Sequence, residues 1–178
     1  MLAPSLARAN SLLMLHPDAP LRAGTVARLA GEASRTVALS ALRSLVRMGI
    51  ARRSIVLGSE VFEANRRSHY YRAAYHAALV DLPIDDALAG ANVVAVFLFG
   101  SVVRGAATHD SDIDLLIVGS TPDERLTQRR LSAIGDRYGR RIDAVFVSTA
   151  DLQQALDAAD PFLTGAVRDG LLIRGDWS

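Results

Sequence analysis

A Gly-Ser pair, followed after ten residues by two aspartates, constrains this chain more than any other feature. The pair is Gly100-Ser101, and the acids are Asp112 and Asp114. An apolar, largely β-branched and aromatic run with the length of a buried strand, residues 93–99, precedes the pair. The pair therefore lies where a buried strand ends, and glycine at that point lets the backbone approach a ligand closely.

The residues that follow the pair predict a phosphate-binding turn. Residues 102–104 can start a short helix whose free N–H groups point back at an anion. The Ser101 hydroxyl adds a further donor, and Gly105 is expected to end the helix. Arg104 is a candidate for binding the nucleotide, with an ion pair to a nearby aspartate as the alternative.

The two aspartates open a second strand-like run, residues 112–118. Side chains two positions apart on a strand share a face, so we expect both carboxylates to point the same way. Like charges in an apolar strand destabilise it unless a cation neutralises them, and Mg²⁺ takes oxygen ligands. Asp143, in a third strand-like segment at residues 141–147, joins them if that strand lies beside the second. The alternatives are that Asp143 caps a loop or that it pairs with Arg140 or Arg141.

This combination resembles the signature of the DNA polymerase β-like nucleotidyltransferases, and most closely the minimal nucleotidyltransferases of prokaryotes. The similarity runs over about residues 85–175 and is carried by residues 100–105 and 110–115. It implies a small α/β domain with a mixed sheet, in which the Gly-Ser turn holds the triphosphate and the acids bind Mg²⁺. The resemblance gives these roles to Gly100, Ser101, Asp112, Asp114 and Asp143.

Charge divides the chain into two parts. Residues 1–80 hold 11 arginines and 4 acidic residues, a net charge of +7, whereas residues 81–178 hold 9 arginines and 15 acidic residues, a net charge of −6. Pro83 breaks a helical pattern where the acidic residues begin. We therefore predict an α/β (α+β) protein of two domains, residues 1–80 and 85–178.

The basic part shows three helical patterns and then two strand-like runs: residues 6–15, 25–30, 34–48, 50–57 and 61–65. Ser34 is a suitable N-cap for the third helix, and Gly49 a suitable end. Gly58-Ser59 suits the tight turn of a hairpin. Three short helices followed by a hairpin resemble a winged helix-turn-helix.

The outer face of the third predicted helix is polar and basic, which predicts that this helix enters the major groove of double-stranded DNA. Arginine pairs at the base of the hairpin are placed to grip phosphates. The DNA-binding candidates are Arg35, Thr36, Ser40, Arg43, Arg47, Arg52, Arg53, Arg66 and Arg67. The alternative is a protein-binding module with a solvated arginine face. Residues 69–80, which hold three tyrosines, predict a helix that links or pairs the domains, with a homodimer contact as a further reading.

Composition excludes several classes of site. The chain has no cysteine, so it has no disulfide and no thiolate metal site, and its four histidines lack ligand spacing. It shows neither a signal-sequence pattern nor an apolar run of membrane-spanning length. We expect a cytoplasmic protein with no membrane partner.

The predicted activity is Mg²⁺-dependent transfer of a nucleotidyl group, AMP from ATP, to an acceptor hydroxyl. Because minimal nucleotidyltransferases often act as antitoxins that nucleotidylate a partner toxin, the resemblance also implies a protein acceptor or toxin partner. The alternative is a DNA-binding transcriptional regulator or antitoxin whose nucleotidyltransferase-like domain senses nucleotide without turnover.

Overall fold

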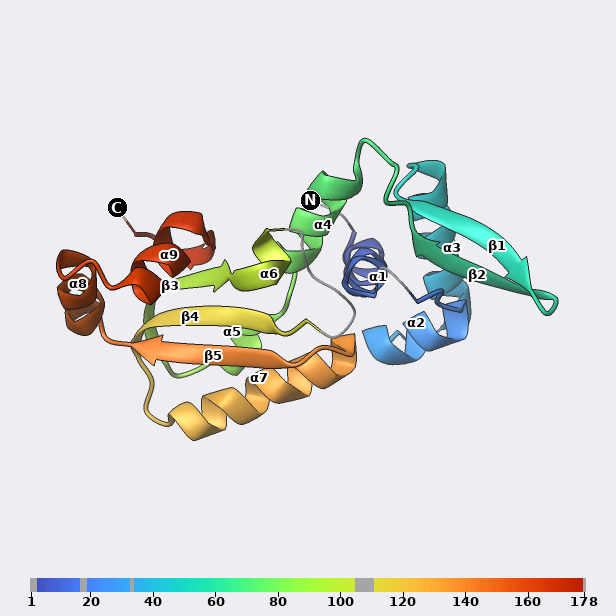
Figure 1. Ribbon diagram of the computed structural model, residues 1–178. Helices are drawn as coiled ribbons and strands as arrows, with labels where there is room; N and C mark the ends of the chain where they lie inside the picture. The colour runs from blue at the N-terminus through green and yellow to red at the C-terminus, as the bar shows by residue number, and fades with distance from the viewer. Residues whose placement is uncertain (1–2, 17–18, 33, 105–110, 178) are drawn as a thin grey trace. The chain divides into compact units, whose positions relative to one another are not determined.

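The computed structural model describes residues 3–16, 19–32, 34–104 and 111–177 (Figure 1). The chain divides into two compact units. Unit 1 comprises Met1–Leu82 and Arg137–Gly139, and unit 2 comprises Pro83–Asp136 and Arg140–Ser178. Every helix of the described residues falls short of the length and apolar character that crossing a membrane requires.

The described residues of unit 1 form four helices and a two-stranded sheet: α1 (Pro4–Leu15), α2 (Ala23–Ala30), α3 (Arg35–Arg47), β1 (Ala51–Val56), β2 (Ser59–Ala64) and α4 (Tyr71–Val80). Ser34 caps α3, because its hydroxyl accepts a hydrogen bond from the Thr36 amide at 3.1 Å. The Asn10 amide donates to the Ala74 carbonyl at 2.8 Å and so ties α1 to α4. The largest fully buried side chains of the unit include Leu12, Leu13, Met14, Leu42, Leu45, Phe62 and Leu79.

The hairpin turn lies one residue earlier than the sequence predicts. Strands β1 and β2 are antiparallel, and the turn between them is Leu57-Gly58, with φ of 49° and 72°. Two central residues with positive φ match the right-handed twist of the flanking strands. Leu21 adds an isolated bridge to Phe62, through two backbone hydrogen bonds of 2.7 and 2.9 Å.

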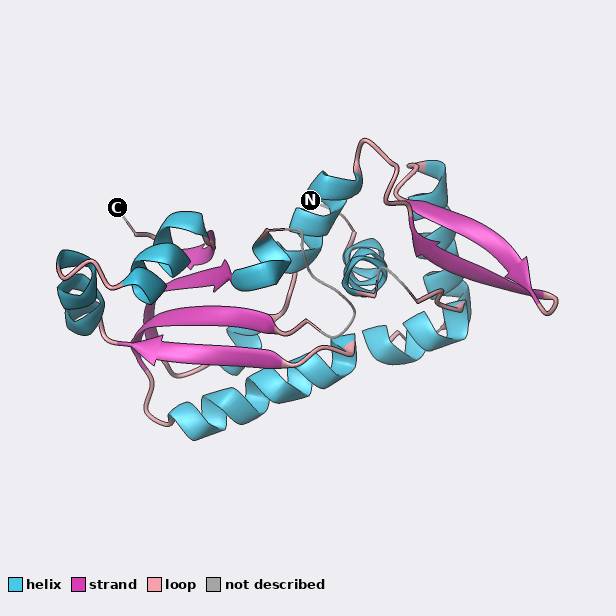
Figure 2. Ribbon diagram, viewed as in Figure 1, coloured by secondary structure: helices cyan, strands magenta, loops and turns pink. Residues whose placement is uncertain are grey.

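Unit 2 is built on a four-stranded sheet with the order β5-β4-β3-β6 (Figure 2). Its elements are α5 (Ile84–Ala87), β3 (Asn92–Phe99), α6 (Gly100–Val103), β4 (Ile113–Ser120), α7 (Glu124–Tyr138), β5 (Ile142–Val147), α8 (Thr149–Asp157), α9 (Pro161–Asp169) and β6 (Leu171–Gly175). Strands β4 and β5 are parallel, and β3 is antiparallel to both β4 and β6. The predicted mixed sheet is therefore confirmed.

Helices cover both faces of this sheet. Helices α8 and α9 pack on one face through a core cluster of Ala95, Phe97, Leu116, Val118, Leu152 and Ala166. The alternate residues of β3 and β4 are also buried, and α7 runs along the opposite side (Figure 1). Because both faces are covered, the central strands are continuous apolar runs, which made them recognisable in the sequence.

Two local features differ from the sequence-based expectation. Asp112 lies just before β4 rather than inside it, because the strand begins at Ile113. Helix α5 was not predicted, since a single turn after Pro83 is too short to show helical periodicity. Gly105 and Asp110 lie outside the described residues.

Candidate nucleotide-binding site

The Gly-Ser turn lies directly against the carboxylate of Asp114. Strand β3 ends at Phe99, which lies opposite Asp114 in the antiparallel ladder with β4. Gly100 adopts φ of +78°, and a Cβ atom there would overlap Oδ2 of Asp114 and lie 3.1 Å from its Cγ. Position 100 therefore requires glycine for two reasons: the left-handed backbone conformation and the close approach of the Asp114 carboxylate.

Helix α6 presents the amides of the turn. It is a single turn of four residues, so its N–H groups have no intrahelical acceptor. Val102 is buried and anchors the helix, whereas Ser101 is half-buried and Arg104 is exposed. The arrangement offers backbone donors, a hydroxyl and a cation on one side of Asp114.

The three predicted acids lie on adjoining segments. Asp114 and Asp143 are direct partners in the parallel ladder of β4 and β5, and Asp112 immediately precedes β4. Burial raises the pKa of Asp114 above its ordinary value, and the negative charges of Asp112 and Asp143 raise it further. Arg104 acts in the opposite direction. Repulsion among these carboxylates makes the site favourable for a cation.

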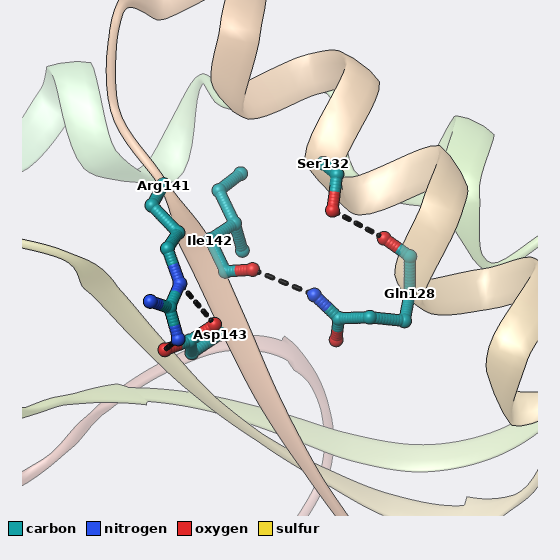
Figure 3. A network of polar contacts seen from close by, with 5 residues as sticks. All are labelled: Gln128, Ser132, Arg141, Ile142 and Asp143. Carbon is teal, nitrogen blue, oxygen red and sulfur yellow. Dashed lines mark hydrogen bonds and ion pairs between the residues drawn. The ribbon is translucent and has the colours of Figure 1, made fainter.

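Asp143 is held by an arginine two positions earlier (Figure 3). Nε of Arg141 donates to Oδ1 of Asp143 at 2.9 Å, and a second guanidinium N–H donates to Oδ2. This contact raises the pKa of Arg141. The structure thus shows the ion pair that the sequence left as an alternative for Asp143. Arg140 instead donates to the Ser111 carbonyl at 2.7 Å.

Helix α7 fixes the strand that carries this ion pair. The side-chain amide of Gln128 donates to the backbone carbonyl of Ile142 at 2.8 Å (Figure 3). The Ser132 hydroxyl donates to the backbone carbonyl of Gln128 at 2.9 Å. Ile142 is itself fully buried. Asp143 therefore projects from a strand whose position is set by both packing and hydrogen bonds.

Among the described residues, no group of three or more histidine, aspartate or glutamate side chains is arranged to hold a metal ion. Mg²⁺, however, is usually bound through one or two carboxylates together with substrate phosphates rather than in an all-protein cage. Asp112 and Asp114 beside an anion-binding turn fit that donor set. Asp143 becomes available only when it leaves Arg141.

Replacing Arg141 with Ala is expected to tighten Mg²⁺ binding about two- to fivefold. The variant removes a cation that competes with the metal for Asp143, and exposed ion pairs of this kind contribute up to about 1 kcal/mol. Isothermal titration of the full chain with Mg²⁺ in the presence of nucleotide measures the effect. Arg125→Ala, which removes an exposed arginine from α7, is the charge-matched control. Equal affinities in both variants would show that Arg141 does not restrain the site.

The predicted DNA-binding residues lie on unit 1. Those on α3 share an exposed face: Arg35, Thr36, Ser40, Arg43 and Arg47. Three of the predicted arginines form ion pairs with acids of the hairpin, which the sequence did not predict. Glu60 pairs with both Arg43 and Arg53, at 2.9 and 2.7 Å, and Glu63 pairs with Arg52 at 3.1 Å. Arg66 and Arg67 follow the hairpin and are exposed.

A basic pocket of about 420 Å³ lies beside α2 and α3 and is lined by Arg22, Arg28 and Arg35, with Gly24, Thr25 and Ser59. Within the described part of the chain, none of these three arginines forms an ion pair. Arg22 and Arg28 were not among the predicted residues. Their signal in the sequence is the stretch at residues 19–31, which contains two arginines and no acidic residue.

Comparison with known proteins bears on unit 2. Residues 85–160 match the model of the nucleotidyltransferase domain family. A curated protein of Methanocaldococcus jannaschii, provisionally named a protein adenylyltransferase, is 31% identical over 83 residues, which are 43% of this chain and 54% of that protein. This chain therefore spans about half the length of that relative.

A solved structure also matches. It is a crystal structure of a Sulfolobus solfataricus protein provisionally named a nucleotidyltransferase, with 20% identity and a TM-score of 0.33. The match covers 60% of this chain and 89% of that one. The residues that match the nucleotidyltransferase domain model, 85–160, include the Gly-Ser turn and all three acids.

Proposed function

We propose that unit 2 transfers a nucleotidyl group, AMP from ATP, to an acceptor hydroxyl. The observation that carries this proposal is the contact between Gly100 and the Asp114 carboxylate. It places an anion-binding turn directly against an acid whose charge is already unfavourable without a cation. A nucleoside triphosphate with Mg²⁺ supplies both the anion and the cation that such a site needs.

Each residue of the site has a role in this reaction. The amides of Gly100 and Ser101, with the Ser101 hydroxyl, bind phosphate oxygens, and Arg104 offsets their charge. Asp112 and Asp114 hold Mg²⁺, with Asp143 as a further ligand or as general base. When bound, Mg²⁺ neutralises charge on the phosphates and activates the attacking hydroxyl.

The transfer step balances without a further reactant. The acceptor oxygen forms a bond to the α-phosphorus as the bond to the β-phosphate oxygen breaks, and pyrophosphate leaves. The proton of the acceptor hydroxyl passes to the Asp143 carboxylate once that group is free of Arg141. A protein hydroxyl is our preferred acceptor, because the M. jannaschii relative carries the name protein adenylyltransferase.

Two isotopic labels test this assignment. The full chain is incubated with Mg²⁺, a cell extract as the source of acceptor, and ATP labelled either at the α- or at the γ-phosphate. Nucleotidyl transfer puts the α-label, and not the γ-label, on an acceptor. Transfer of the γ-label instead would identify a phosphoryl transferase and overturn the proposal.

A second function, DNA binding by unit 1 as a winged helix-turn-helix, is favoured by the basic pocket. Arg22, Arg28 and Arg35 line it without an acidic partner among the described residues. The exposed face of α3 adds further polar and basic side chains. The same observation supports the alternative of a DNA-binding regulator whose unit 2 senses nucleotide, which DNA binding without any label transfer would favour.

Arg28→Ala together with Arg35→Ala is expected to weaken binding of duplex DNA and to lower the slope of log affinity against log salt by about 2. Each phosphate contact contributes about 1 to that slope, because it releases condensed counterions. Fluorescence anisotropy of the full chain from 50 to 200 mM salt measures it. Arg125→Ala with Arg129→Ala is the charge-matched control on α7. An unchanged slope would assign the basic pocket to another partner.

A further inference from the structure

A cavity of about 300 Å³ opens beside the Gly100 turn. Its wall comes from the end of β3, from α6 and from α9, and includes Phe99, Gly100, Arg104, Phe162, Gly165 and Asp169. This volume lies at the lower end of those found for small-molecule sites. A ligand whose phosphates rest on the turn therefore has a half-open space of ring-system size directly beside it.

Phe162 gives this cavity an aromatic wall. Its ring meets that of Phe99 edge to face, with centroids 5.5 Å apart and planes at 84°. The side chain nevertheless remains 50% exposed, although it is large and apolar. Asp160 fixes its position by capping α9, accepting a hydrogen bond from the Leu163 amide at 2.8 Å. An exposed aromatic ring on a fixed helix start suits the stacking of a flat base.

Asp169 gives the cavity a hydrogen-bond acceptor, which suits a nucleoside better than a phosphate group. Arg168 donates two hydrogen bonds to it, at 2.8 and 2.7 Å, which lower the pKa of Asp169 and keep it ionised at neutral pH. An ionised carboxylate only accepts hydrogen bonds. It cannot donate a hydrogen bond to a phosphate oxygen, whereas it can accept one from the N–H and O–H groups that a nucleoside carries on its base and sugar.

We propose that this cavity receives the nucleoside of the bound nucleotide, with the base stacked on Phe162 and an N–H or O–H group directed to Asp169. The proposal rests on the proposed nucleotidyl transfer and adds the part of the substrate that a phosphate-binding turn does not specify. Stacking accepts every base, because every base has a π face. Selection among nucleotides therefore falls to Asp169.

Gly165 allows the cavity to be filled without disturbing the fold. A Cβ atom at this helical position would meet no heavy atom within 4 Å, and its φ is not in the left-handed region. Leucine is also a better helix former than glycine. Gly165→Leu should therefore fold at least as stably as the wild type while its side chain occupies the cavity. Gln154→Leu, at an exposed position on α8, is the matched control.

The test compares the affinity of the full chain for ATP and for inorganic tripolyphosphate, each with Mg²⁺, by isothermal titration. Gly165→Leu should lower ATP affinity at least about tenfold, and Phe162→Ala about 5- to 100-fold. Both should leave tripolyphosphate binding unchanged, as should Gln154→Leu for both ligands. Phe162→Tyr should restore ATP binding.

The outcomes separate the two proposals. Wild-type binding of ATP that neither Gly165→Leu nor Phe162→Ala weakens would overturn the nucleoside pocket alone. Equal loss of ATP and tripolyphosphate would overturn it too, because the variants would then act on the turn. A wild type that binds neither ligand would overturn both proposals. Asp169→Asn assigns the polar contact: weaker binding of ATP but not of 2′,3′-dideoxy-ATP identifies the sugar, and equal weakening identifies the base.

Discussion

Asparagine in place of Asp114 is expected to lower nucleotidyl transfer about a thousandfold or more. The substitution keeps the shape of the side chain and removes the charge that holds Mg²⁺, whose charge stabilisation in the transition state is worth several kcal/mol. Transfer of α-label from ATP measures the loss. Asp86→Asn, at an exposed carboxylate on α5, is the control and should retain full activity. Activity of Asp114→Asn within tenfold of wild type would remove this residue from the site.

The same variant should be slightly more stable than the wild type without ligand. The folded-state pKa of Asp114 is raised, so its contribution to stability is present below the unfolded value, near 3.8, and is lost as the pH rises through the folded value. At pH 7 the ionised side chain therefore destabilises the fold. The gain is less than about 1 kcal/mol, because water screens this partly exposed group. Melting curves should differ at pH 7 and converge as the pH falls.

Gly100→Ala is the second change with a large expected effect. A side chain at φ of +78° costs about 1–2 kcal/mol for the backbone alone, and the new methyl group would also overlap the Asp114 carboxylate. We expect a destabilisation larger than the backbone cost, together with loss of ATP binding. Urea unfolding and isothermal titration measure the two effects.

Gly90→Ala separates the two causes. Gly90 has a similar φ of +86°, but a Cβ there would meet nothing within 4 Å. This control should therefore show the backbone cost and keep ATP binding. If both variants lose the same stability and both bind ATP, the contact between Gly100 and Asp114 has no functional role.

The central strands of unit 2 were predictable because each corresponds to a local run of apolar residues in the sequence. The buried strands β3 and β4 are largely apolar runs of strand length, which periodicity identifies. The mixed sheet followed from the resemblance. By contrast, the turn of the hairpin was misplaced by one residue, because both Leu57 and Gly58 adopt positive φ and leucine gives no such signal.

The sequence did not show which side chains form ion pairs or line a common pocket. Glu60 lies between Arg43 and Arg53 because the hairpin folds back beside α3, a tertiary fact that no local pattern contains. The choice between free and paired states of Asp143 likewise depends on the rotamer of Arg141. The basic pocket brings together Arg22, just before α2, and Arg35, the first residue of α3, which are thirteen positions apart in the sequence. Such groupings become visible only in three dimensions.

Binding of nucleotide to the full chain tests the central claim most directly, because it precedes transfer and needs no acceptor. Isothermal titration with ATP is carried out with and without Mg²⁺, for the wild type and for Asp112→Asn with Asp114→Asn. We predict Mg²⁺-dependent binding to the wild type, which by mass action also raises its melting temperature, and loss of that dependence in the double variant. Equal Mg²⁺-dependent affinity in both proteins would contradict the assignment of the metal and nucleotide site.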